Sequence, residues 1–203
     1  MTLTVTDNQG ATDTVTHSVS PSTPTQDISF LGANTYDNSA PSGSVNIPTV
    51  ADGDTLLLFE SHASTSISAA TPAGWTLIGS TSSSNLRSAV YEKTASASDS
   101  GTPVAVNFSG TVKAEVTVAA YHNVSASAPI EAATSSTATN TSSHDTPALN
   151  GLSAGSWVVS FWTDKSTTTT AWTPPAAVTK RADVYGTAGG AVSALLADSG
   201  NAV

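Results

Sequence analysis

The 203-residue chain predicts an all-β fold, on three observations. Short runs rich in Val, Thr, Leu and aromatic residues recur along it, and clusters of Gly, Pro, Asn, Asp and Ser separate them. No segment of a dozen residues carries apolar positions at helical spacing. Ser and Thr make up roughly a third of the chain, well above ordinary usage. This pattern of short strands is typical of a sandwich or a barrel.

The first expected element is a β-hairpin over residues 1–20. Apolar residues alternate with Thr, Ser and His on both arms, and residues 7–10 between them form a strong turn cluster, Asp-Asn-Gln-Gly. Residues 21–26 follow with two prolines among small polar residues. Such a segment is extended and solvated, so we expect a linker.

From residue 27 to residue 203 the chain predicts one antiparallel β-sandwich. Turn-forming clusters separate the expected strands, and a Ser/Thr/Ala/Asn-rich stretch over 135–143 predicts a long loop. A threonine run over 167–170 predicts a loop or an edge strand. The expected strands cover residues 28–33, 44–47, 55–61, 75–81, 88–93, 104–108, 114–122, 130–133, 157–163, 178–185 and 191–196.

The N-terminal stretch LTVTDNQGATDTVTHSVS resembles the closing hairpin of a PKD domain, an immunoglobulin-like sandwich of bacterial surface proteins. The resemblance covers only about the first 20 residues, whereas a complete sandwich of this kind needs roughly 80 to 100. It implies that residues 1–20 are the terminal fragment of an Ig-like domain.

The remainder resembles a jelly-roll-like module found beside PKD repeats in actinobacterial secreted proteins and in bacteriophage tail proteins. The stretches ADGDTLLLF, TPAGWTLIGS, VTVAAYHNV, GSWVVSFW and ALLADSG carry this resemblance, in this order. It implies a jelly-roll-like sandwich over 27–203 that lacks its last strand, and it implies no catalytic residues. It also implies a location that is extracellular, secreted or on the virion surface.

Charge excludes several classes of partner. Fifteen acidic and six basic residues give a net charge of -9, so there is no basic stripe to bind nucleic acid or an anionic membrane. A membrane-spanning helix needs a run of about 18 apolar residues, and the chain has no such run, so we expect no membrane insertion. The chain has no cysteine, which excludes disulfides and thiolate chemistry.

Aromatic residues give the strongest indication of a binding site, because sugars stack on flat rings. Alternation puts Trp162 on the face opposite its buried neighbours, and Trp172 and Tyr185 follow in the sequence. Together with Asp164 and Lys165 they form the predicted ligand-binding set. The alternative is that both tryptophans belong to the core, where tryptophan is usually found.

A glycan hydrolase or lyase would need two facing carboxylates. The candidates are Glu60, Glu92, Glu115 and Glu131. Alternation places Glu115 opposite the apolar face of its strand, so it is expected to face solvent. No catalytic residue is assigned. The motif Gly151-Leu152-Ser153-Ala154-Gly155 matches the nucleophile elbow of hydrolases, but its expected loop-then-strand setting favours a simple turn.

Metal binding has only weak candidates. Asp52 and Asp54 lie on one turn, and Asp198 lies on another. Acidic residues in such turns usually bond their own backbone, so we expect no cofactor, with a structural calcium ion as the alternative.

The sequence thus favours a non-catalytic recognition or adhesion module of a larger extracellular or phage-tail protein. Its expected partner is a cell-surface glycan or a neighbouring protein subunit. The alternatives are a structural stalk or a filament or tail assembly subunit, and then a glycan-active enzyme. Open strand edges would allow oligomers or filaments.

Overall fold

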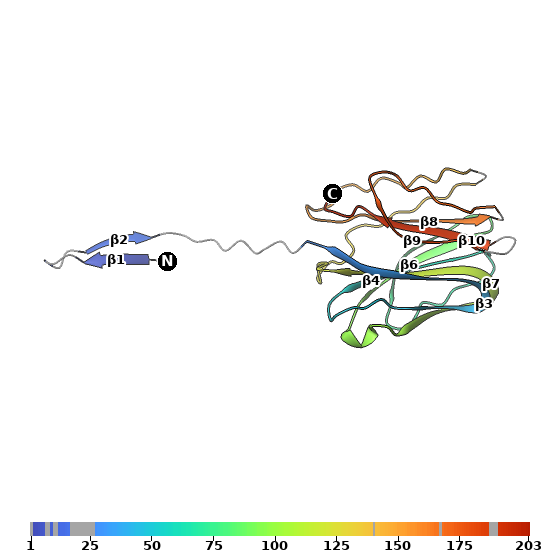
Figure 1. The fold of residues 1–203 in the computed structure, drawn as a ribbon, viewed down its shortest axis with the longest axis horizontal. Helices are drawn as coiled ribbons and strands as arrows, with labels where there is room; N and C mark the ends of the chain where they lie inside the picture. The colour runs from blue at the N-terminus through green and yellow to red at the C-terminus, as the bar shows by residue number, and fades with distance from the viewer. Residues whose placement is uncertain are drawn as a thin grey trace.

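The described part of the chain is built from antiparallel strands. The computed structural model describes residues 2–6, 9, 12–16, 27–139, 141–166, 168–186 and 191–203. Within them lie ten strands in three sheets, one short 3-10 turn and no α-helix, which confirms the all-β prediction (Figure 1). The elements are β1 (Thr2–Thr6), β2 (Thr12–Thr16), β3 (Ser29–Asn46), β4 (Thr55–His62), β5 (Thr76–Ser82), β6 (Arg87–Thr94), η1 (Ala97–Asp99), β7 (Pro103–His122), β8 (Val159–Ser166), β9 (Thr179–Val184) and β10 (Ala191–Asp198).

Strands β1 and β2 form a sheet of their own. They pair antiparallel, with Thr2 opposite Thr16 and Thr6 opposite Thr12, so a hairpin does form here. The predicted linker over 21–26 lies outside the described residues. The division of the chain into domains therefore stays a prediction.

The largest sheet has five strands in the order β3-β7-β4-β6-β5. Every residue of its central strand β4 is buried, because both faces of the sheet are covered. Leu56 and Leu58 pack on one face, and Leu57 and Phe59 pack on the other. A continuous apolar run is what a strand buried on both faces requires.

The edge of this sheet folds back over its own face. The expected strands at 28–33 and 44–47 are one long strand, β3, which is irregular between Ala40 and Ser42. Pro41 at this point is tolerated because β3 is an edge strand. A Cβ atom on Gly43 would lie 2.7 Å from a methyl group of Val116, so only glycine allows this close approach. Likewise, the expected strands at 104–108 and 114–122 are the two halves of β7.

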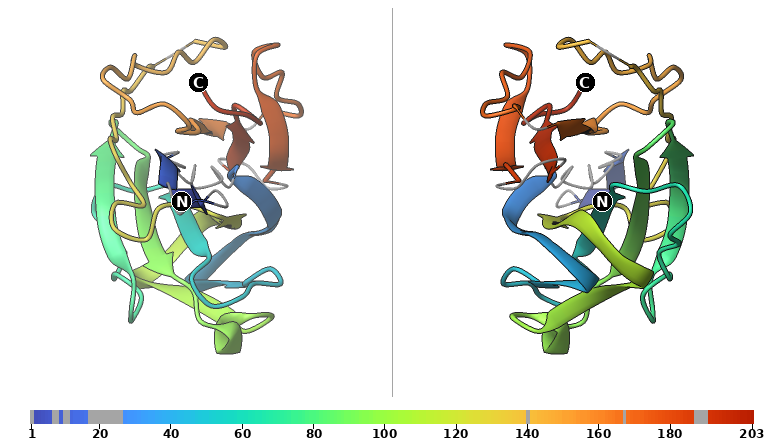
Figure 2. Two further views of the ribbon diagram at one scale, coloured as in Figure 1. Left: turned by 90° about the vertical axis from the view of Figure 1, so that its left-hand side faces the viewer. Right: turned by 90° about the vertical axis from the view of Figure 1, so that its right-hand side faces the viewer.

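The second sheet has three strands in the order β8-β10-β9 and packs on the five-stranded sheet, consistent with a β-sandwich (Figures 1 and 2). The jelly-roll topology stays a prediction. Between the sheets the rings of Phe59 and Phe161 stack with centroids 4.7 Å apart, and Ala119 and Leu196 are fully buried beside them. Burial of this apolar face holds the two layers together.

A buried ion pair joins β9 and β10 of the three-stranded sheet, and both of its members contact the five-stranded sheet. Asp198 of β10 is 0% exposed, and its carboxylate accepts hydrogen bonds from Arg181 Nε at 2.8 Å and from the hydroxyl of Tyr121 at 3.2 Å. The amide of Gly200 donates to its second oxygen at 2.9 Å. The Arg181 guanidinium also lies 4.5 Å from the ring centroid of Phe30. Donors from β7, β9 and the segment after β10 therefore bond to this one carboxylate.

Candidate functional site

The connection from β7 to β8 spans residues 123–158 and is the most irregular part of the sandwich. Its described residues form no strand, so the expected strand at 130–133 is wrong. Ile130 is the one large apolar residue of that stretch and is only partly buried, with small and polar residues after it. A single apolar contact does not offset the entropy of ordering a strand. The long loop predicted over 135–143 lies within this β7–β8 connection.

Glu131 links two distant parts of the β7–β8 connection. Its carboxylate accepts hydrogen bonds from the Ser153 amide at 2.8 Å, the Ser153 hydroxyl at 2.6 Å and the Ser156 hydroxyl at 2.7 Å. The bonds from Ser153, followed by that from Ser156, lower the pKa of Glu131. Gly151 and Gly155 have φ angles of 74° and 96°, so the G-x-S-x-G motif makes tight turns. The serine hydroxyl of this motif donates its hydrogen bond to Glu131.

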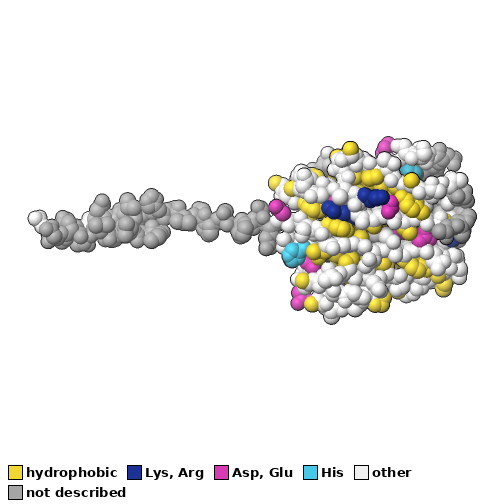
Figure 3. Space-filling model, in the orientation of Figure 1, with side chains coloured by type: hydrophobic (Ala, Val, Ile, Leu, Met, Phe, Trp, Pro, Cys, Tyr) yellow, Lys and Arg dark blue, Asp and Glu magenta, His cyan; other side chains and the backbone are white. Residues whose placement is uncertain are grey.

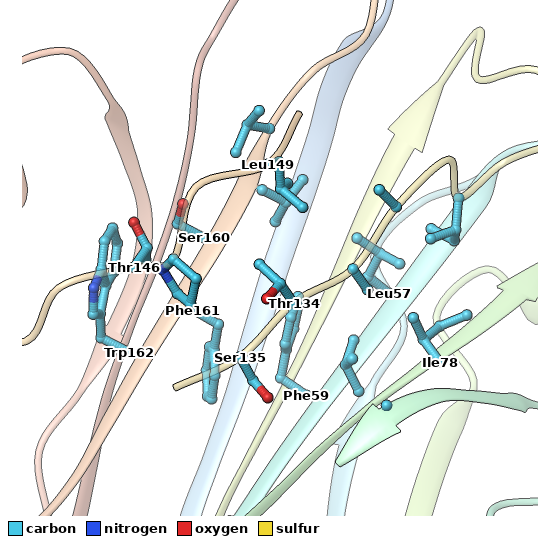
Figure 4. Close-up of a pocket in the computed structure, with 18 of the residues that line it drawn as sticks. Leu57, Phe59, Ile78, Thr134, Ser135, Thr146, Leu149, Ser160, Phe161 and Trp162 are labelled. Carbon is cyan, nitrogen blue, oxygen red and sulfur yellow. The ribbon is translucent and has the colours of Figure 1, made fainter. Parts of the chain in front are cut away.

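The β7–β8 connection borders a cavity of about 1860 Å³ that opens between the two sheets. We call this the inter-sheet cavity. It lies beside β8 on one side and beside β4, β5 and β6 on the other, and Figure 2 shows the connection running along this side of the molecule. In the close-up of Figure 4, Thr134 and Ser135 of the connection lie close to Phe161 of β8 and to Phe59 of β4. Parts of the chain that are far apart in the sequence thus build one cavity.

The lining combines apolar side chains with hydroxyl groups. The apolar part includes Leu57, Phe59, Ile78, Leu149 and Phe161 (Figure 4). Serine and threonine hydroxyls supply most of the polar part, and each can both donate and accept hydrogen bonds. They include Ser80, Thr81, Ser88, Thr134, Ser135, Thr146, Ser160 and Thr163.

Charged groups are few on this lining, and most are acidic. Among the lining residues that the structure describes are one lysine and one histidine, His144. The face of the molecule in Figure 3 shows the same scarcity of charge. The charged residues on the lining are Asp27, Glu131, Asp145, Asp164 and Lys165.

Trp162 lies on the outer face of the three-stranded sheet, as alternation predicts, but it is covered there. It is 9% exposed and packs with Leu195 and Trp172. Its neighbour Asp164 accepts a hydrogen bond from the Thr169 hydroxyl at 2.7 Å, which binds the segment after β8 to the sheet. Trp162 therefore offers little free ring surface.

Trp172 and Tyr185 lie together on this outer face. The Trp172 amide donates to the Tyr185 hydroxyl at 3.1 Å, and that hydroxyl donates to Asp183 at 2.7 Å. Lys165 belongs to the inner face instead, because side chains alternate along β8. The predicted set is thus divided. Because β8 is an edge strand, residues from both of its faces border the cavity, so Trp162, Asp164 and Lys165 line it, whereas Trp172 and Tyr185 do not.

The expectation that Glu115 faces solvent is wrong, because Glu115 is 0% exposed. It shares a face with Thr117, as alternation predicts, but the second sheet covers that face. The Thr117 hydroxyl donates to one carboxylate oxygen, and the other oxygen has no partner in the described part of the chain. Burial raises the pKa of Glu115 well above its ordinary value, and the charge of Asp37 adds to this while the bond from Thr117 opposes it.

Glu60 is buried on the opposite face of the same sheet, beside His62. Nδ1 of His62 lies 2.9 Å from the Glu60 carboxylate, and Nε2 lies 3.0 Å from the carbonyl oxygen of Ile67. Burial lowers the pKa of His62, but the hydrogen bond and the charge of Glu60 outweigh it, so the pKa is raised. Both partners are acceptors, which favours the doubly protonated ring.

The four glutamates of the carboxylate-pair hypothesis do not meet in the cavity. Glu60 and Glu115 are buried on opposite faces of the sheet, and Glu92 is half-buried on β6. Of the four, Glu131 alone lines the cavity, and its carboxylate is engaged by serine groups. The cavity therefore holds no facing pair drawn from these residues.

The weak metal candidates have protein partners instead. Asp52 accepts a hydrogen bond from the amide of Ala97, and Asp54 is bonded to His122 and to a backbone amide of its own turn. Asp198 belongs to the ion pair with Arg181 of β9. In the described ranges no group of three potential ligands converges.

Sequence reasoning missed the residues that build the cavity, because they come from separate strands and from the β7–β8 connection. One signal was available. Few connections in compact domains exceed about 15 residues without strands or helices, and those that do are often functional. The stretch from 123 to 158 contained only one short expected strand.

The fold and the cavity define an all-β protein with two packed antiparallel sheets and a polar-walled cavity between them. A comparison with protein-family models, with curated proteins and with solved structures found no match to this chain. Among the residues that the structure describes, no helix is long and apolar enough to cross a membrane.

Proposed function

We propose that this chain is a non-catalytic recognition module that binds cell-surface glycans in the inter-sheet cavity. In this proposal it belongs to a larger extracellular or phage-tail protein. The observation that carries the proposal is the lining of the cavity, which joins an apolar, partly aromatic floor to walls of serine and threonine hydroxyls.

This lining suits the chemistry of a sugar chain. A pyranose ring presents apolar C–H faces, which pack on the partly exposed apolar side chains of the lining, Ile78, Leu149 and Phe161, and it presents hydroxyls around its edge. Hydroxyl side chains can pair with those edges as donors or acceptors. Binding pockets for small molecules usually measure about 300 to 1,000 Å³, so a cavity of about 1860 Å³ has room for several sugar units.

The cavity supplies few charged groups, so each binding event is expected to be weak. Many copies along a fibre or a surface would raise the overall strength, because each further contact is intramolecular once the first has formed. Adhesion of this kind needs no catalytic group. This agrees with the separated glutamates.

The test is binding to a glycan array, followed by calorimetry on the strongest glycans. The variant Ser135→Trp places a bulky ring in the cavity from an exposed position on the β7–β8 connection. Its matched control is Ser127→Trp, which adds the same ring to an exposed residue of the same connection outside the lining. Neither change removes a core side chain, so both variants should fold.

We expect the parent chain and Ser127→Trp to bind the same glycans, and Ser135→Trp to lose at least tenfold in affinity. Equal binding by both variants would place any glycan site elsewhere. If the parent chain binds no glycan, the proposal fails and a stalk or assembly subunit becomes the better hypothesis. Sedimentation of the intact chain would then test for filaments.

A further inference from the structure

We infer that the inter-sheet cavity selects uncharged oligosaccharides and discriminates against those that carry carboxylate or sulfate groups. This inference rests on the proposed function, because it names the class of glycan that the same cavity accepts. It comes from the signs and positions of the charged groups on the lining.

Carboxylates border the cavity on several sides. Asp27 lies just before β3 and Asp145 lies in the β7–β8 connection, and both are exposed. Glu131 lies elsewhere in that connection, and its hydrogen bonds from serine favour the ionised form. Asp164 is held on β8 by the hydroxyl of Thr169. An anionic sugar entering the cavity would meet like charge from the connection, from β8 and from the start of β3.

Among the described residues of the lining, Lys165 carries the one side-chain ammonium group. Lys165 lies near the end of β8 on the face shared with Thr163 and Phe161. It is half-buried there. The chain as a whole carries a net charge of -9, so the field around the cavity also opposes anions. One lysine among four carboxylates does not form an anion site.

Neutral sugars avoid the electrostatic repulsion that these carboxylates exert on an anionic sugar. Their hydroxyls need only the donors and acceptors that serine and threonine provide. Like-charge contacts at a binding surface work mainly by excluding wrong partners. The lining is therefore suited to selecting neutral chains by rejecting charged ones.

The experiment compares neutral glycans with charged partners of the same length. Suitable probes are N-acetyllactosamine with its sulfated form, and cellohexaose with hexagalacturonate. We expect the neutral member of any pair that binds to bind about tenfold more tightly at low salt. The difference should shrink at 0.5 M salt, because the Debye length falls to roughly 4 Å.

A charge-matched pair of variants tests whether the lining causes the selectivity. Asp27→Asn with Asp145→Asn removes two exposed carboxylates from the lining. The control, Thr49→Lys with Thr111→Lys, makes the same change in net charge at exposed residues outside the lining. We expect the first variant to reduce the ratio of neutral to charged glycan affinity about threefold, and the control to leave this ratio unchanged.

The possible failures are distinguishable. Equal or tighter binding of the charged glycans would overturn this inference and leave the proposed function standing. A control variant that narrows the preference as much as the Asn variant would show that total charge, and not the lining, sets it. Absence of binding to both members of every pair would overturn the inference and the proposed function together.

Discussion

The buried ion pair between Arg181 of β9 and Asp198 of β10 allows a quantitative test of its contribution to stability. The change is Asp198→Asn, which keeps the shape of the side chain and removes its charge. Arg181 is then left without its anion while it is only 19% exposed. Breaking a buried ion pair on one side costs about 3–5 kcal/mol, and the partial exposure of Arg181 points to the lower end, about 3 kcal/mol.

The assay is equilibrium unfolding in guanidinium chloride, followed by tryptophan fluorescence. A domain of this size has a denaturant dependence of about 4–5 kcal/mol/M, so a loss of about 3 kcal/mol lowers the midpoint by about 0.7 M. The control is Asp183→Asn, which breaks the more exposed pair between Lys180 and Asp183. Exposed pairs contribute little, so this control should move the midpoint much less.

A double variant separates the ion pair from simple loss of packing. Arg181→Met with Asp198→Leu removes both charges and keeps apolar contact with Phe30. We expect it to be more stable than the sum of its single changes predicts, because no unpaired charge remains. If Asp198→Asn stays within about 0.5 kcal/mol of the parent chain, the assigned role of the pair is refuted.

Two further predictions concern pH. Folding raises the pKa of Glu115. Its contribution to the free energy of unfolding is therefore full below the ordinary carboxyl pKa and is lost as pH rises through the folded value. Glu115→Gln should accordingly stabilise the protein more at pH 8 than at pH 5, as measured by urea unfolding. A gain that is the same at both pH values would contradict this. The raised pKa of His62 means that its contribution is full below the ordinary histidine pKa and is lost as pH rises through the raised value. Glu60→Gln should reduce the loss of stability above pH 6, whereas the half-buried control Glu92→Gln should not, and NMR titration of His62 in the parent chain should give a midpoint above 6.5.

The strands themselves follow from local pattern. The apolar run at 55–61 and the alternation at 88–93 predicted β4 and β6 to within one residue at each end. Alternation also predicted correctly that Glu115 lies opposite the apolar face of its strand. These properties depend on neighbours in the sequence, since side chains of successive strand residues point to opposite faces.

The burial of each strand face depended on parts of the chain that are distant in the sequence. Glu115 is buried because β10 and its neighbours pack over it, and no residue near Glu115 encodes that contact. Trp162 is covered by Trp172 because the segment after β8 folds back over the sheet. A period of two in the sequence distinguishes the faces of a strand without showing which face meets solvent.

The sequence by itself determined that this protein is built from β-strands and that it carries little charge. The tertiary structure decided that β3 and β7 are long strands, whose pairing is irregular between Ala40 and Ser42 of β3. It also decided that the β7–β8 connection borders a cavity between two sheets. Strand formation depends on residues close together in the chain, whereas a cavity exists only where strands remote in sequence meet and leave space between them.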